Sequence, residues 1–135
     1  MNEYVSDAHP MTWYMFASTR LGNAAKSVLR EAAAGKVKIY LPAVAIAEMI
    51  MTIERRRLAP ATMPELVLHL NWMKSQPNYE FMPLDPDLVI SSRTLTIIPD
   101  IFDRLIVAEA LRLNLPLITR DSVIRSSGLV NVVWD

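Results

Sequence analysis

Four acidic residues stand where predicted strands give way to helices, and their type and placement suit them to chemistry. Asp7 and Asp121 each follow a strand-like run of apolar residues. Glu48 and Asp103 fall in the first turns of two predicted helices, and Asp100 stands just ahead of Asp103. Because ligands bind beyond the carboxyl ends of parallel strands, we expect these acids to converge at one edge of a sheet.

Carboxylates that lie close together repel one another, which raises at least one pKa, and a divalent cation relieves that repulsion. The chain has no cysteine and only two histidines, His9 and His69, which excludes Cys-ligated zinc, iron–sulfur clusters and His-rich sites. The expected ion is a hard cation with oxygen ligands, Mg²⁺ or Mn²⁺. Such an ion activates water and stabilises charge on a phosphoryl oxygen, so the acids suit phosphodiester hydrolysis.

Each acid also has an ordinary structural interpretation. Asp103 in a first helical turn is a favourable partner for the helix dipole, and Asp121 can cap a helix that begins near Ser122. Glu48 can be a solvated residue, although its neighbours are mostly apolar and a charge in such a stretch needs a partner or a cavity. The predicted convergence therefore carries more weight than any single acid.

Composition limits the class of protein. The 135 residues, of which 52% are hydrophobic, predict one globular domain over residues 1–135. No apolar run reaches the roughly 18 residues of a membrane span, and no basic, apolar leader opens the chain, so we expect a cytoplasmic protein that does not enter membranes. The zero net charge argues against sequence-blind nucleic-acid binding by bulk charge and leaves local basic patches open.

Strand-like and helix-like segments alternate along the chain, which predicts an α/β fold with a parallel sheet covered by helices. Asn23 is expected to cap the first long helix, and Gly35 marks its end. The expected strands cover residues 4–7, 37–41, 80–84, 115–119 and 129–134, and the main expected helices cover 10–16, 44–57, 64–74 and 102–113.

The chain resembles the PIN domain family, in particular the ribonuclease toxins of type II toxin–antitoxin pairs, the VapC-like proteins. Residues 4–9, 41–48, 100–110 and 115–121 carry the likeness, and the last two stretches together are the more specific part. The resemblance implies a three-layer α/β/α sandwich with a parallel central sheet. It also implies cleavage of RNA with Mg²⁺ or Mn²⁺, a homodimer and a small cognate antitoxin as partner.

Carried over residue by residue, Asp7, Glu48, Asp103 and Asp121 match the acidic catalytic site of that family. Among the matched acids, Asp7, Asp103 and Asp121 are the candidate metal ligands, and Asp100 and Thr119 are candidates for a supporting role. The family usually has Thr or Ser after its first Asp, where a hydroxyl would help to orient that carboxylate, whereas this chain has Ala8.

Three arginines are candidates for contact with RNA phosphates: Arg55, Arg104 and Arg120. Arg55 can equally be a solvated helix end that favours the dipole, and Arg104 and Arg120 can hold neighbouring acids by ion pairing. His9 lies near Asp7 in the sequence, and we interpret it as structural rather than as a general base. Trp72 is either a core residue or an anchor for a protein partner.

The sequence leaves three functions to compare. The first is a metal-dependent endoribonuclease toxin. The second is a PIN-like module that binds RNA or protein without cutting. The third, a receiver-like phosphotransfer domain, is disfavoured because such domains place a lysine near the phosphate late in the chain. Here the last lysine is Lys74, so none adjoins Asp103 or Asp121.

Overall fold

Five parallel strands form the centre of the computed structural model, which describes residues 1–135. Their order across the sheet is β3-β2-β1-β4-β5, and every neighbouring pair is parallel. All carboxyl ends therefore meet at the same edge of the sheet. The strands are β1 (Asn2–Ser6), β2 (Val37–Pro42), β3 (Tyr79–Met82), β4 (Leu117–Ile118) and β5 (Val132–Val133).

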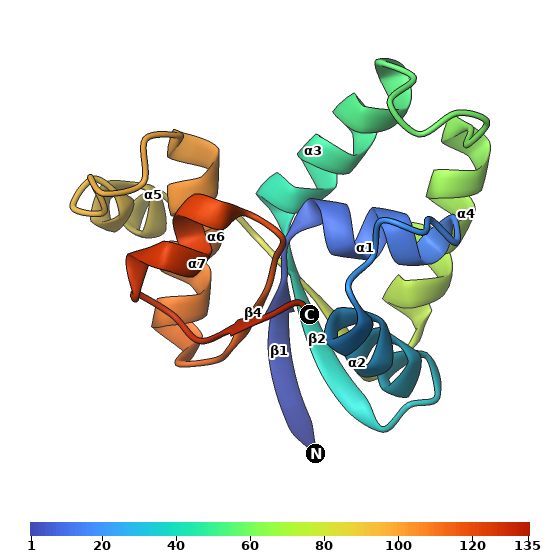
Figure 1. Ribbon diagram of the computed structural model, residues 1–135, viewed down its shortest axis with the longest axis horizontal. Helices are drawn as coiled ribbons and strands as arrows, with labels where there is room; N and C mark the ends of the chain where they lie inside the picture. Colours follow the sequence, from blue (N-terminus) through green and yellow to red (C-terminus); the bar gives the residue numbers. More distant parts are fainter.

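The protein has seven helices, and helices cover both faces of this sheet, which confirms the predicted three-layer α/β/α sandwich. Figure 1 shows α1, α2 and α4 on one side of the sheet and α5, α6 and α7 on the other. None of the helices is long and apolar enough to span a membrane. The helices are α1 (Ala8–Met15), α2 (Asn23–Ala33), α3 (Ala43–Glu54), α4 (Met63–Ser75), α5 (Pro86–Ser92), α6 (Ile101–Leu113) and α7 (Ser122–Ser127).

The core lies where both faces of the sheet meet the helices. Val5 of β1, Ile39 of β2 and both residues of β4 are completely buried, as expected for strands covered on both sides. Met49 of α3 is also completely buried, because an unbranched side chain fits an irregular space between helix and sheet. This packing fixes the strand ends that position the acids.

The start of α2 differs from the prediction that Asn23 caps it. Gly22 is the N-cap residue, without a side-chain hydrogen bond, and Asn23 is the first helical residue. The backbone N–H of Ala25 instead donates to the carbonyl oxygen of Trp134 at 3.0 Å. A Cβ atom at Gly22 would lie 2.3 Å from that oxygen, so only glycine allows this approach. A distant backbone carbonyl thus replaces the expected side-chain cap.

The last two strands are shorter than the predicted segments 115–119 and 129–134. Pro116 has no N–H to donate to a ladder, so β4 begins only at Leu117, although the Pro116 carbonyl still accepts from Val5 N–H at 2.9 Å. Gly128 ends α7 in the left-handed conformation, and the chain pairs again only at Val132. The remaining boundaries agree with the predictions to within a few residues.

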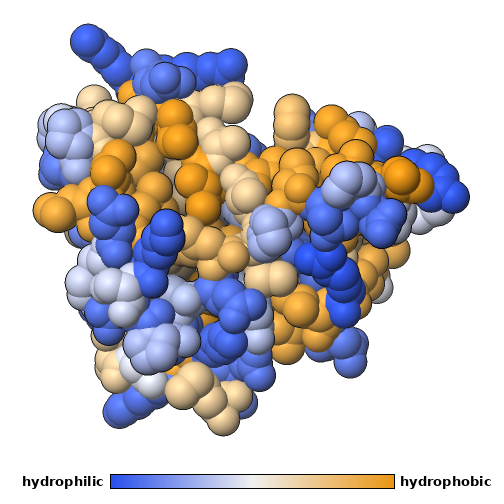
Figure 2. Space-filling model, turned by 180° about the vertical axis from the view of Figure 1, so that it is seen from behind, coloured by the Kyte–Doolittle hydropathy of each residue, from blue (hydrophilic) through white to orange (hydrophobic).

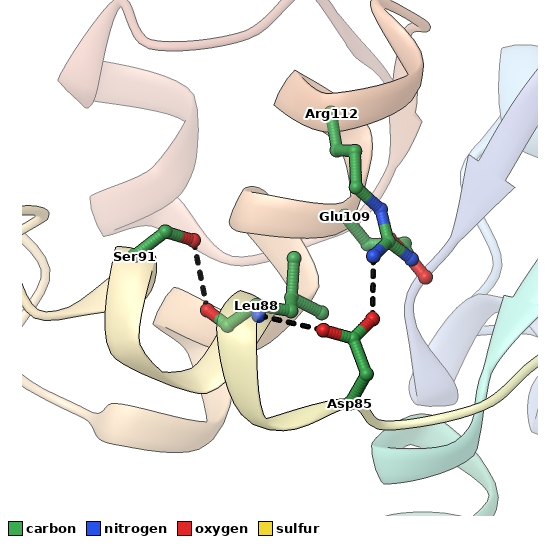
Figure 3. Close-up of polar contacts among 5 residues, drawn as sticks. All are labelled: Asp85, Leu88, Ser91, Glu109 and Arg112. Atoms are coloured by element: carbon green, nitrogen blue, oxygen red, sulfur yellow. Dashed lines mark hydrogen bonds and ion pairs between the residues drawn. The ribbon is translucent and has the colours of Figure 1, made fainter.

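An ionic cluster holds α5 against α6, and Figure 3 shows its members. Asp85 caps α5 by accepting from Leu88 N–H at 2.8 Å, and it also accepts from Arg112 of α6 at 2.6 Å. Arg112 forms a second ion pair, again at 2.6 Å, with Glu109, whose side chain is 1% exposed. Burial raises the pKa of Glu109, and the positive charge of Arg112 acts against that rise. The cluster orients α6, which carries Asp103.

Candidate active site

A polar cleft of about 540 Å³ opens at the carboxyl edge of the sheet, and no hydrophobic residue lines it. All four acids that the sequence singles out face this cleft, as does Asp100. They come from the end of β1, from α3, from the start of α6 and from the β4–α7 link. The nine lining residues are Asp7, His9, Glu48, Asp100, Asp103, Arg120, Asp121, Ser122 and Arg125.

Asp7 is held by two hydrogen bonds and is only 5% exposed. As the N-cap residue of α1, it accepts from Ala8 N–H at 2.7 Å through Oδ1. Its Oδ2 accepts from the Thr119 hydroxyl, also at 2.7 Å. The same hydroxyl oxygen accepts from Asp121 N–H at 3.1 Å. Thr119 therefore links two of the acids and supplies the orienting hydroxyl that Ala8 lacks.

We predict that Thr119→Val weakens any function of Asp7, because valine keeps the buried volume and removes the donor. Loss of such a supporting partner typically costs about 10–100-fold in metal affinity or activity. Thr119→Ser keeps the hydroxyl and should retain most of the function. Mn²⁺ affinity of the two variants, measured by calorimetry, checks this. Equal affinities would show that the hydroxyl does not support Asp7.

Glu48 carries a buried carboxylate oxygen that has no partner. Its Oε1 makes no hydrogen bond with any group of the protein. Burial, followed by repulsion from Asp7 and Asp103, raises the pKa of Glu48 from its ordinary 4.5 to about 8. Burying a carboxylate without a hydrogen-bond donor costs free energy, and a bound proton or cation would reduce that cost.

The acids of α6 and α7 combine capping with a place in the cleft. Asp100 is the N-cap residue of α6 and accepts from the N–H groups of Phe102 and Asp103. Asp121 caps α7 by accepting from Ile124 N–H at 2.9 Å, as the ordinary interpretation of that residue predicts. Burial and then repulsion from Asp7 and Asp121 raise the pKa of Asp103 from 3.8 to about 7.

The donor set fits a hard divalent cation. No three His, Asp or Glu side chains are arranged closely enough in the structure to enclose a metal ion together. Mg²⁺ typically takes only one or two direct carboxylates and keeps several waters, so a closed cage is not required. The unpartnered oxygen of Glu48 and the mutual repulsion of the acids are what such an ion would relieve.

The three candidate arginines are separated by the structure. Arg120 lines the cleft, and its guanidinium lies 5.3 Å from the centre of the Trp13 ring. Arg104 instead donates to the carbonyl oxygens of Ile98 and Pro99, so it holds the loop before α6. Arg55 is the exposed C-cap residue of α3 and does not line the cleft, because it lies two helical turns beyond Glu48. Of the three candidates, only Arg120 therefore lines the acidic cleft.

Three residues of the cleft are absent from the predicted site: His9, Ser122 and Arg125. His9 is exposed there, with its ring 5.3 Å from that of Trp13. Arg125 stands four residues after Asp121, and residues four apart share a helix face. That spacing could have indicated Arg125 once α7 was assigned. Its ion pair with Asp135 is 3.6 Å long, and the Asp135 side chain is largely exposed.

The sequence of the chain matches the family model described as PIN domain over residues 4–127. The chain belongs to the PIN domain family. The match covers β1 to α7, so this PIN domain contains every acid of the cleft within the matched range. The comparison confirms the family that the four sequence stretches indicated. No curated protein matches the sequence.

Solved structures share the fold of this PIN domain at low sequence identity. VapBC2 from Rickettsia felis, bound to a DNA fragment from its promoter, has a TM-score of 0.68 at 13% identity over 96% of both chains. FitAcB from Neisseria gonorrhoeae has a TM-score of 0.63 at 19% identity, covering 96% of this chain and 95% of that one. FitAB bound to an IR36 DNA fragment has a TM-score of 0.62 at 19% identity, covering 96% of this chain and 92% of that one.

Proposed function

We propose that this PIN domain is an endoribonuclease that needs Mg²⁺ or Mn²⁺ and hydrolyses RNA phosphodiester bonds at its acidic cleft. The observation that carries the proposal is the cleft itself, in which five acids and no apolar side chain gather around an unpartnered oxygen of Glu48. Members of the PIN domain family are typically nucleases, which supports the reaction class.

The proposed ligands of the cation are Asp7, Asp103 and Asp121, one or two of them directly and the rest through metal-bound water, with Glu48 completing the set of catalytic acids. When bound, a divalent cation supplies charge that neutralises phosphoryl oxygens and makes water more acidic. Residues of the chain itself position the acids and the substrate. Thr119 and Ala8 N–H fix both oxygens of Asp7, and Asp100 fixes the first turn of α6. Arg120, at the cleft wall, is placed to contact a phosphate of the RNA.

The direct test is incubation of the purified protein with single-stranded RNA in the presence of Mn²⁺ or Mg²⁺. We expect internal cleavage that stops when a chelator removes the ion. RNA that stays intact under every metal condition would contradict the nuclease and leave the alternative function. That alternative is a PIN domain that binds RNA or a protein without cutting, for which neutral net charge is the supporting observation.

We propose a small antitoxin as protein partner, because two of the solved structures with this fold are VapBC2 and FitAB, each bound to DNA. An apolar cleft of about 450 Å³ between α1, α2 and α4 can receive it. Trp72, which is 47% exposed, lies at this cleft and packs edge-on against Tyr79. A half-exposed tryptophan at a cleft suits an interface anchor.

We propose that a second copy of the chain covers another apolar surface, on the half of the molecule that holds α5 and α6. Figure 2 shows apolar side chains gathered on that half, at the right of the view. Ile90, Ile97 and Phe102 are each more than half exposed there. Exposed apolar patches of this kind mark interaction sites, which supports the homodimer.

A further inference from the structure

The indole ring of Trp13 holds two guanidinium groups at once. Arg120, at the wall of the acidic cleft, lies 5.3 Å from the ring centre, and Arg20 lies 5.8 Å from it. Both distances are within the range of cation–π attraction. Trp13 itself is 2% exposed and packs against Trp134, so the ring is a fixed platform. The two cations are therefore positioned by the core of the protein.

Both guanidinium groups are free to take an anion. Neither Arg20 nor Arg120 forms an ion pair. The cations of the ion pairs in the structure are Lys38, Arg112 and Arg125. Both side chains are exposed. In Figure 1 the segment between α1 and α2, which carries Arg20, runs back along α1 toward the sheet. Arg20 thus shares the Trp13 ring with Arg120, which lines the acidic cleft.

Arg20 also lines a second cleft, of about 720 Å³, that lies between the α1–α2 segment and the α3–α4 segment. Arg57 stands on the opposite wall of this cleft. Phe16 and His69 line it as well, with their rings edge to face at 5.5 Å. Cations combined with accessible aromatic rings are the features with which proteins hold single-stranded nucleic acid.

We propose that Arg20 binds a phosphate of the RNA one or more nucleotides away from the acids, and that the strand continues from there into the cleft of Arg57, Phe16 and His69. This inference rests on the proposed ribonuclease function and names the path of its substrate. Arg120 contacts the phosphate nearest the acids, and Arg20 contacts a phosphate further along the strand, on the Trp13 platform. The aromatic rings accept unstacked bases, which selects a single strand over a duplex.

The test is the salt dependence of binding, because each phosphate that the protein neutralises contributes a fixed amount to it. A fluorescent single-stranded RNA is titrated with chelator-treated protein at several NaCl concentrations, and the dissociation constant is read from anisotropy. For single strands the logarithmic slope falls by about 0.7 for each phosphate that is no longer neutralised. We expect that decrease for Arg20→Gln and for Arg57→Gln, with weaker binding at every salt concentration.

The matched control is Lys36→Gln, which removes the same charge from an exposed residue at the amino end of β2, remote from the carboxyl edge. It should leave the slope unchanged, and Arg20→Lys should keep most of it. Wild-type protein that does not bind the RNA, or an unchanged slope in Arg20→Gln, overturns the path. Cleavage with Mn²⁺ is measured separately: cleavage with no effect of Arg20 refutes only the path, and binding without cleavage refutes only the nuclease.

Discussion

RNA cleavage is expected to be abolished when Asp103 is replaced by Asn, while the protein stays folded. The substitution keeps the size of the side chain and removes one of the charges that the cation neutralises. Removing a group that only supports a metal ligand costs about 10–100-fold, so removing a ligand should cost more than about a hundredfold in kcat/KM. Initial cleavage rates of a fluorogenic RNA with saturating Mn²⁺ provide the measurement.

The matched control for this variant is Asp87→Asn. Asp87 also lies in the first turn of a helix, α5, but it is exposed and does not line the acidic cleft. Its replacement removes the same charge and a similar interaction with a helix dipole. Cleavage by the Asp87 variant should equal that of the wild type. Full cleavage by the Asp103 variant would place the reaction outside this cleft.

The stability of the metal-free protein is expected to fall as the pH rises from about 5 to about 8.5, which is the reverse of ordinary acid denaturation. The pKa of Glu48 is about 8 and that of Asp103 about 7 in the folded protein, against ordinary values of 4.5 and 3.8. Between the ordinary and the folded values, the folded state binds more protons than the unfolded chain. Stability is therefore highest below that window and declines as the two groups ionise.

Thermal unfolding at several pH values, with chelator and with Mn²⁺, measures this effect. Mn²⁺ should raise the unfolding temperature strongly at the upper end of the window and little at the lower end, where protons already neutralise the acids. Glu48→Gln removes the carboxyl group whose pKa is about 8 and should flatten the metal-free profile. A metal-free protein that becomes more stable across the same range would contradict the crowding of charges in the cleft.

The acids of the site could be predicted because each follows from a local pattern. Asp7 and Asp121 end strand-like runs, and parallel strands bring their carboxyl ends to one edge. Glu48 was marked by its apolar neighbours, since a charge in such a stretch needs a special environment. A similar local rule placed the cap Asp121, whose side chain accepts from the first turn of α7.

The remaining features depend on packing between segments far apart in the sequence. The hydroxyl of Thr119 reaches Asp7 only because β4 lies beside β1. Gly22 replaces Asn23 as the cap because the carbonyl of Trp134 approaches it from the end of the chain. Arg20 and Arg120 both approach the Trp13 ring because the segments that carry them pack against the same part of the core. No local spacing encodes such encounters, because they arise only when the layers of the fold pack together.

The central claim, that acids from distant segments share one divalent cation, is tested most directly by calorimetric titration with Mn²⁺ at about pH 7 in two buffers of different ionisation enthalpy. We predict one bound cation per chain and a release of protons, because Glu48 and Asp103 still hold part of their protons at that pH. Absence of binding, or binding that persists unchanged in the Glu48→Gln/Asp103→Asn double variant, would contradict the claim.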